Sequence, residues 1–388
     1  MKIKSIYADR VLNSEGSFGL QCQISFDEGE PVFATVSFCE ECDLKASIEL
    51  INKILAPQIL QEMPESPIQL DELLVDIDGT KDRNNIGKSC MLVISMAFYK
   101  AFAKFEGMNL FDYIATLAGY DSVSLPIPFI SILGQDKLVD DYFVVPYGAK
   151  SINKALEVTR LLIDRLEEAI ANEDGQCAIN ERGVFVNPFS VQTKLFSVLN
   201  SAIKKVGPEV FGLGINISAE YYEPGESKYL INKSKQDFKG VIEFYSKMIE
   251  KNKLFFIEDP LDPQDWQGWI NLNISLEDKC NFIANNLIKS RLSFMVKAIE
   301  YEAVGTIAIN PMQVGTITET IQLIKLCQEN GVATVLQATD SAIDSFVADL
   351  AVGSSVNYTK FGGLSGGGHA TKYNRLLEIE KILIKNYL

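Results

Sequence analysis

Two hydrophobic patterns divide the chain. Over residues 3–38, apolar and polar positions alternate around the turn sequence Asn13-Ser14-Glu15-Gly16, which predicts strands joined by a turn. Apolar positions then recur at helical spacing over three segments: 43–65, 87–104 and 109–117. Strands followed by helices are typical of an α+β domain, which we place at residues 1–124.

From residue 125, short apolar runs alternate with longer segments of helical periodicity. The runs predict buried strands at 127–133, 211–217, 254–260, 282–287, 306–311 and 333–338. The helical segments between most of them are 152–171, 192–205, 236–252, 290–303 and 316–330. This alternation indicates parallel strands with crossover helices, and its extent suits a (β/α)₈ barrel of about 250 residues. We therefore predict an α/β fold with a barrel at residues 125–388.

Polar residues close most of these apolar runs. A polar residue at the end of one buried strand is commonplace, but the carboxyl ends of barrel strands share one rim, where chemistry is located. The sequence therefore predicts a site formed by Asn216, Glu258, Asp259, Asn285, Asn286, Asn310, Gln337 to Asp340 and Lys360.

Composition narrows the function classes. The 388 residues are 47% hydrophobic and carry a net charge of −15, which predicts a globular protein that binds neither nucleic acid nor an anionic membrane. No apolar run is long enough to span a bilayer, and the start has no apolar signal core. Seven scattered cysteines favour a reducing cytoplasm. The single histidine, His369, excludes sites that need two imidazoles.

Two further segments invite a functional interpretation. The glycine-dense run from Gly362 to His369 precedes a helix, so it predicts either a loop over the barrel mouth or a phosphate cradle, with His369 as a substitute base. Cys39 and Cys42 have the spacing of a metal or redox pair, but acidic neighbours oppose thiolate chemistry. We expect these two cysteines to be unrelated loop thiols.

Several motifs resemble the enolase family, and the resemblance covers nearly the whole chain. RVLNSEGS resembles the family's opening strand and turn, and LVDIDGTKDRNNIGKSCMLVIS resembles its LDGT segment. The most specific matches are FFIEDPLDPQDWQGW and INPMQVGTITET. The resemblance implies an α+β domain on a modified (β/α)₈ barrel. It also implies magnesium-dependent interconversion of 2-phosphoglycerate and phosphoenolpyruvate, in which a lysine base and Mg²⁺ act on an enolate.

The resemblance places the family's three acidic magnesium ligands at Asn216, Glu258 and Asn285, so one acid is retained. Its catalytic lysine falls on Asn310, and its general-acid glutamate falls on Glu181. A second glutamate becomes Asp141, and the lysine of the last strand is kept as Lys360. The loop histidine is deleted, the phosphate arginine is absent near 337–339, and 38–43 replace the serine lid.

These replacements predict a pseudoenzyme of the enolase family. An amide cannot act as a general base near neutral pH, and magnesium binding is expected to be weak or absent. The retained Glu181, Glu258, Asp141 and Lys360 are expected to form ion pairs, although Lys360 remains a candidate to receive a small anion. The alternative is a weakly active phosphopyruvate hydratase, or a re-purposed enolate-forming lyase that uses Glu181 and Lys360 or His369.

The partner expectations also follow from the resemblance. Family members commonly dimerise through the N-terminal domain, but Glu15 replaces the turn arginine and Gln21 replaces the nearby strand glutamate. We therefore expect either an altered homodimer or a different protein partner.

Overall fold

The computed structural model describes residues 3–27, 29–38, 43–134, 139–173, 175–180, 182–189, 192–217, 222–223, 228–231 and 234–386. The N-terminal domain begins with an antiparallel sheet whose strands are β1 (Ile3–Leu12), β2 (Phe18–Phe26) and β3 (Val32–Val36). At the predicted turn, the side-chain oxygen of Asn13 accepts hydrogen bonds from the backbone N–H groups of Glu15 and Ser17. Gly16 adopts a left-handed φ of 81°, which suits glycine.

Helices pack on one face of this sheet. The longest is α4 (Lys88–Phe105), which is buried along most of its length, as its apolar sequence predicts. The segment predicted as one helix over 43–65 is instead α1 (Leu44–Leu50), a π-helical turn (Ile51–Leu55) and α2 (Ala56–Glu62). Pro57 lies in the first turn of α2, where its missing N–H has little cost. The other helices are α3 (Pro67–Asp78) and α5 (Leu110–Ala118).

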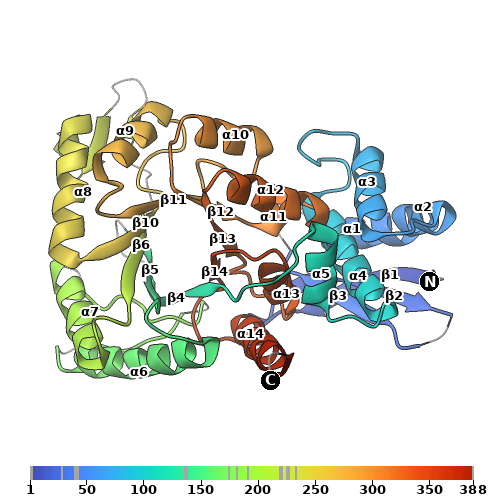
Figure 1. Cartoon of the computed structure of the whole chain (residues 1–388), viewed down its shortest axis with the longest axis horizontal. Helices are drawn as coiled ribbons and strands as arrows, with labels where there is room; N and C mark the ends of the chain where they lie inside the picture. The colour runs from blue at the N-terminus through green and yellow to red at the C-terminus, as the bar shows by residue number, and fades with distance from the viewer. Residues whose placement is uncertain are drawn as a thin grey trace.

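Eight strands close a barrel, which confirms the predicted fold class. Around the barrel they run in the order β10, β11, β12, β13, β14, β4, β5, β6. Figure 1 shows the barrel at one side of the molecule and the N-terminal sheet at the other, with α11–α14 on the side between them. The strands are β4 (Ile127–Gly134), β5 (Val139–Val145), β6 (Gly212–Ile217), β10 (Leu254–Glu258), β11 (Asn281–Ala284), β12 (Thr306–Ile309), β13 (Ala333–Gln337) and β14 (Tyr358–Lys360).

The barrel is not wholly parallel, so that part of the alternation argument was wrong. Strand β5 runs antiparallel to both β4 and β6, whereas the other neighbouring pairs are parallel. Because β5 follows β4 directly as a hairpin, no crossover helix separates them in the sequence. The sequence analysis therefore did not predict β5 as a strand. A small separate sheet contains β7 (Tyr222–Glu223), β8 (Lys228–Ile231) and β9 (Ser234–Gln236).

Helices surround the barrel and continue to the end of the described chain. The helical segments predicted from periodicity are confirmed with small shifts at their ends. In the part of the chain that the structure describes, no helix is both long and apolar enough to cross a membrane. The helices are α6 (Ile152–Ala171), α7 (Gln192–Val206), α8 (Phe238–Asn252), α9 (Trp266–Leu276), α10 (Leu292–Glu300), α11 (Pro311–Val314), α12 (Ile317–Glu329), α13 (Phe346–Gly353) and α14 (Gly367–Asn386).

An aromatic cluster fills the interior of the barrel. The ring centroid of Phe129 lies 5.1 Å from that of Phe143 and 4.8 Å from that of Phe256. Gly214 makes room for this packing, since a Cβ there would lie 2.2 Å from the Phe143 ring. The cluster is distinct from the main core between the strands, the helices and the N-terminal domain. It forms an apolar floor beneath the polar residues at the carboxyl ends of the strands.

Candidate functional site at the barrel mouth

Lys360, at the end of β14, lies at the centre of the barrel mouth. Its Nζ atom is 2.7 Å from Glu258 Oε2 and 2.9 Å from Asp141 Oδ2, so it bridges two carboxylates. The same ammonium lies 4.7 Å from the centroid of the Phe143 ring, on the aromatic floor. Burial by itself lowers the pKa of Lys360, but the charges of Glu258 and Asp141 outweigh burial and raise it above its usual range. The predicted ion pairing of these three residues is therefore confirmed.

Glu258 has hydrogen-bond partners on both carboxylate oxygens. Oε2 accepts from Lys360, and Oε1 accepts from Asn285 Nδ2 at 3.1 Å and from Gln337 Nε2 at 2.7 Å. The side chain is 1% exposed. One cation and two amides therefore neutralise and solvate a carboxylate that water does not reach. We call Asp141, Glu258, Asn285, Gln337 and Lys360 the barrel-mouth network.

Sheet register brings the other acidic member to the same place. Asp141 on β5 is paired with Asn216 on β6, and Asn216 is in turn paired with Glu258 on β10. Asp141 Oδ2 also accepts a 2.8 Å hydrogen bond from the Ser131 hydroxyl. The structure thus brings Asn216 and Glu258 together at one rim, as the strand-end pattern predicts. Asp141, which only the family resemblance placed in the site, joins them from near the start of the antiparallel strand β5.

The donor set at the family's metal position does not fit Mg²⁺. The cation requires oxygen ligands, most of them in practice carboxylates, phosphates or water. Asn285 turns its NH₂ group toward Glu258, and both oxygens of Glu258 already accept hydrogen bonds from the protein. Both oxygens of the one retained acid are thus already hydrogen-bonded to neighbouring side chains. Among the described residues, no group of three or more histidine, cysteine or acidic side chains is arranged to hold a metal ion.

Asn310, at the position of the family's catalytic lysine, is the N-cap residue of α11. Its side-chain oxygen accepts a 2.9 Å hydrogen bond from the backbone N–H of Met312. Its own backbone N–H donates to Ser290 Oγ at 3.0 Å. The amide therefore stabilises the first turn of a helix, a role that a lysine at this position cannot perform.

Asp259 follows Glu258 and is equally buried, with a left-handed φ of 49°. Its carboxylate accepts hydrogen bonds from the backbone N–H groups of Asn285 and Asn286, and so connects the ends of β10 and β11. Burial, and then the adjacent charge of Glu258, raise the pKa of Asp259 to about 8. The residue holds the rim together rather than facing an open site.

His369 is a buried packing residue within α14. Its Nδ1 lies 3.2 Å from the Ser365 carbonyl oxygen, and its Nε2 lies 3.1 Å from that of Thr339. The ring packs on Gly362, where a Cβ would lie 2.9 Å from it. Both ring nitrogens therefore face backbone carbonyls, which leaves neither free to serve as the substitute base.

Three predicted positions lie outside the described residues: Glu181, Cys39 and Cys42. Two residues that matter at the rim were missed by the sequence argument. Ser131 donates to Asp141, and Lys372 donates to the carbonyls of Ala338 and Asp340 at 2.6 and 2.8 Å. A polar residue inside the apolar run FISIL was the available signal for Ser131. No pattern in the sequence indicated Lys372, because two of its partners are backbone carbonyls and the third, Asp340 Oδ2 at 3.4 Å, lies 32 residues away in the chain.

Comparison with family models identifies the class. The chain matches the C-terminal TIM barrel domain of enolase over residues 122–387 and the N-terminal domain of enolase over residues 37–114. The match to the barrel domain alone spans well over half of the chain. The protein therefore belongs to the enolase family, whose members typically use Mg²⁺.

Proposed function

We propose that this enolase-family protein does not interconvert 2-phosphoglycerate and phosphoenolpyruvate and has a binding role instead. The observation that carries the proposal is the barrel-mouth network. Glu258 is the one acid retained at the family's magnesium-ligand positions. Both of its carboxylate oxygens accept hydrogen bonds, from Lys360, Asn285 and Gln337. A site arranged in this way is complete without metal or substrate.

The proton-transfer chemistry supports the same conclusion. An amide at position 310 has no basicity near neutral pH, and loss of a positioned base typically costs about 10²–10⁴-fold in rate. Lost phosphate and metal interactions act in the same direction, although such losses are not additive. Asn310 is also committed to capping α11.

The alternative enolate-forming enzyme would need Lys360 to lose a proton. A lysine base must be neutral, whereas Glu258 and Asp141 raise the pKa of Lys360 and stabilise its charged form. The same two carboxylates occupy the ammonium that would otherwise receive an anion. The role of Glu181 in this alternative remains a prediction, as do a homodimer and a protein partner.

The test is phosphoenolpyruvate formation from 2-phosphoglycerate with millimolar Mg²⁺, followed at 240 nm. We expect no formation above the uncatalysed rate in the wild type, in Asn310→Lys or in Glu181→Ala. Circular dichroism establishes that each variant is folded, and Lys381→Ala, on the exposed face of α14, is the control for handling. Wild-type activity that Glu181→Ala abolishes would contradict the proposal and favour the re-purposed enzyme.

A second arm asks how much of the site would have to be rebuilt. The triple variant Asn216→Asp, Asn285→Asp, Asn310→Lys restores the charges at the family's metal and base positions. We expect it to bind Mg²⁺ more tightly than the wild type in a calorimetric titration while remaining poorly active, because the phosphate arginine and lid serine are still missing. A wild type that binds Mg²⁺ as tightly as the triple variant would contradict the interpretation of the barrel-mouth network.

A further inference from the structure

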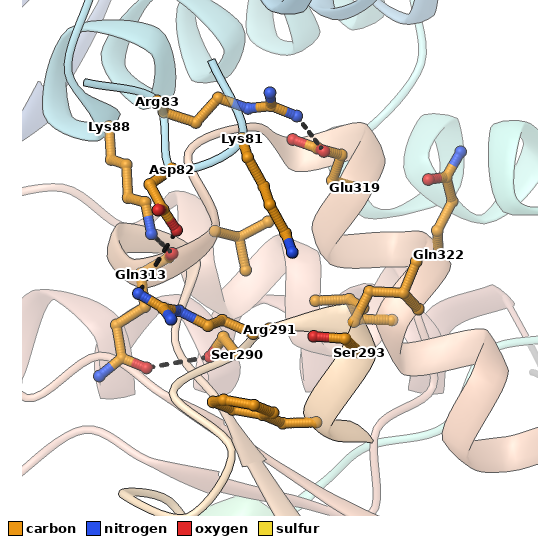
Figure 2. Close-up of a pocket in the computed structure, with 14 residues that line it drawn as sticks. Lys81, Asp82, Arg83, Lys88, Ser290, Arg291, Ser293, Gln313, Glu319 and Gln322 are labelled. Carbon is orange, nitrogen blue, oxygen red and sulfur yellow. Dashed lines mark hydrogen bonds and ion pairs between the residues drawn. The ribbon is translucent and has the colours of Figure 1, made fainter. Parts of the chain in front are cut away.

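A second hollow lies between the two domains, away from the barrel-mouth network. One wall is the segment Lys81–Lys88, which leads into α4, and the other is Ser290–Phe294, which follows β11. Part of α11 and α12, between Gln313 and Leu323, completes it. We call this hollow the interdomain cleft; its volume is about 440 Å³. Figure 2 shows the side chains of both walls pointing into the shared space.

Positive charge is concentrated in the interdomain cleft. This is unusual in a chain whose net charge is −15. The charged side chains that line the cleft are four cations, Lys81, Arg83, Lys88 and Arg291, and two acids, Asp82 and Glu319. Since the cations outnumber the acids, the field in the cleft attracts anions while most of the surface repels them.

Ion pairs between the lining residues do not neutralise all of the positive charge in the interdomain cleft. Arg83 is 2.7 Å from Glu319 Oε1, and Arg291 is 3.4 Å from Asp82 Oδ1. Lys88 donates to the backbone carbonyl of Gln313, a neutral partner. Lys81 has no ion-pair partner among the residues that the structure describes, and its ammonium points into the space between the walls (Figure 2). Two ammonium groups therefore remain without a carboxylate.

Lys88 is partly withdrawn from water and lies near other cations. Burial, and then the charge of Arg291, hold the pKa of Lys88 below its usual value. An anion between the walls would oppose this effect, because a nearby negative charge favours the charged form of a lysine.

The backbone holds both walls in specific conformations. Arg83 on one wall and Lys289 and Ser290 at the start of the other have φ values of 60°, 49° and 50°. Left-handed backbone is disfavoured for residues other than glycine and is maintained only where surrounding contacts enforce it. Ser290 is held in this way, since its hydroxyl accepts from the Asn310 N–H and lies 3.1 Å from Gln313 Oε1. The cationic walls are thus preorganised.

We propose that the interdomain cleft binds a small phosphorylated metabolite, a phosphate monoester with a compact organic group. Guanidinium groups match the oxygen geometry of phosphate, and the two ammonium groups without carboxylate partners balance a dianion. The volume exceeds what a bare phosphate fills and falls in the range of small-molecule sites. Leu292, Phe294 and Leu323 supply an apolar surface for the organic part. The site is separate from the proposed loss of enolase activity and does not depend on it.

The experiment is isothermal titration calorimetry on the full chain with ribose 5-phosphate, inorganic phosphate, sulfate and ribose. We expect ribose 5-phosphate to bind most tightly, inorganic phosphate and sulfate more weakly, and ribose not at all. Lys81→Met and Arg291→Met, one on each wall, should each weaken ribose 5-phosphate binding by about tenfold or more, the loss expected for a charged hydrogen bond.

Two control variants remove a lysine and an arginine that do not line the interdomain cleft. Lys381→Met removes an exposed lysine on α14, and Arg10→Met removes an arginine that lies 4.7 Å from the centroid of the Phe18 ring, as Arg291 lies 5.8 Å from that of Phe294. Both should bind like the wild type. The proposal is overturned if wild type does not bind ribose 5-phosphate at millimolar concentration, if sulfate binds equally well, or if the control variants weaken binding as much as the cleft variants.

Discussion

The barrel-mouth network and the interdomain cleft differ in how their charges are balanced. In the network, Lys360 lies between Glu258 and Asp141, and amides complete the hydrogen bonding of Glu258. In the cleft, cations outnumber acids, and Lys81 points into the space between the walls with no carboxylate partner in the described part of the chain. A network that satisfies itself contributes to folding, whereas an unbalanced one contributes to binding. The two regions therefore differ in what their charges are available for, since those of the network are paired within the protein and the cations of the cleft are in excess.

The largest effect that tests this comparison is expected from Lys360→Met. Removing the cation leaves two buried carboxylates without it, and breaking a buried ion pair typically costs about 3–5 kcal/mol. We expect the free energy of unfolding, measured by urea denaturation, to fall by about that amount. The triple variant Asp141→Asn, Glu258→Gln, Lys360→Met removes all three charges and should recover most of the loss.

The stability difference between the wild type and Lys360→Met should depend on pH in a defined direction. The pKa of Lys360 is raised in the folded protein, so its contribution is fully present below its unfolded pKa of about 10.4 and is lost only as the pH rises through the higher folded value. The difference between wild type and Lys360→Met should therefore stay constant from pH 7 to pH 9. A difference that shrinks across this range would show that Lys360 is not held between two charged carboxylates.

The next largest effect concerns the neutral amide beside Glu258. Asn285→Asp replaces a hydrogen-bond donor with a second carboxylate, and a lost buried donor costs about 1–3 kcal/mol. Lower pH should reduce the loss, because protonation removes the repulsion, and Mg²⁺ should reduce it as well. Asn286→Asp is the matched control, since the Asn286 side chain makes no hydrogen bond to Glu258. Equal losses in the two variants would contradict the role given to Asn285.

A smaller effect is expected from Asn310→Ala. Loss of a side-chain N-cap typically costs about 0.5–2 kcal/mol, whereas Asn310→Ser retains a capping oxygen and should remain close to wild type. Thermal denaturation of both variants measures the difference. If Asn310→Ala were as stable as Asn310→Ser, the amide would need an explanation other than capping α11.

The smallest change in stability is expected in the interdomain cleft. Glu319→Gln releases Arg83 from a partly exposed ion pair, and such pairs contribute about 0–1 kcal/mol to stability. The variant should bind ribose 5-phosphate more tightly in calorimetry, because the cleft gains net positive charge. Glu378→Gln, which removes an exposed partner of Arg375 on α14, should leave binding unchanged. Weaker binding by Glu319→Gln would contradict an anion site.

The sequence predicted the elements whose signals are local. Alternating apolar runs and helical segments were enough for the barrel, and residues that end strands, such as Glu258 and Lys360, were correctly placed at one rim. Strand β5 was missed because a hairpin places no helix between it and β4. Helix α3 was missed as well, since the surrounding segment was interpreted only through its family motif.

Partners of individual side chains were harder to predict. The ion pairing of Lys360 with Glu258 and Asp141 could be anticipated, because Glu258 and Lys360 close strands of one barrel and the family resemblance placed Asp141 in the same site. The capping role of Asn310 could not, since it depends on how α11 begins immediately after β12. The interdomain cleft was also not predicted, because Lys81 and Arg291 are far apart in the sequence and neither ends a strand.

The position of Lys360 on the last strand has a consequence for synthesis of the chain. Lys360 lies 102 residues after Glu258, so at about 5–20 residues per second a ribosome adds it roughly 5–20 s later. Until then β4 and β13 lack the strand between them, because β14 is the element that closes the barrel. Throughout that interval the nascent chain presents one unpaired edge of β4 and two carboxylates without their cation, and the edge of β13 is added only after residue 337. Chaperones that recognise open sheet edges would therefore meet this protein late in translation.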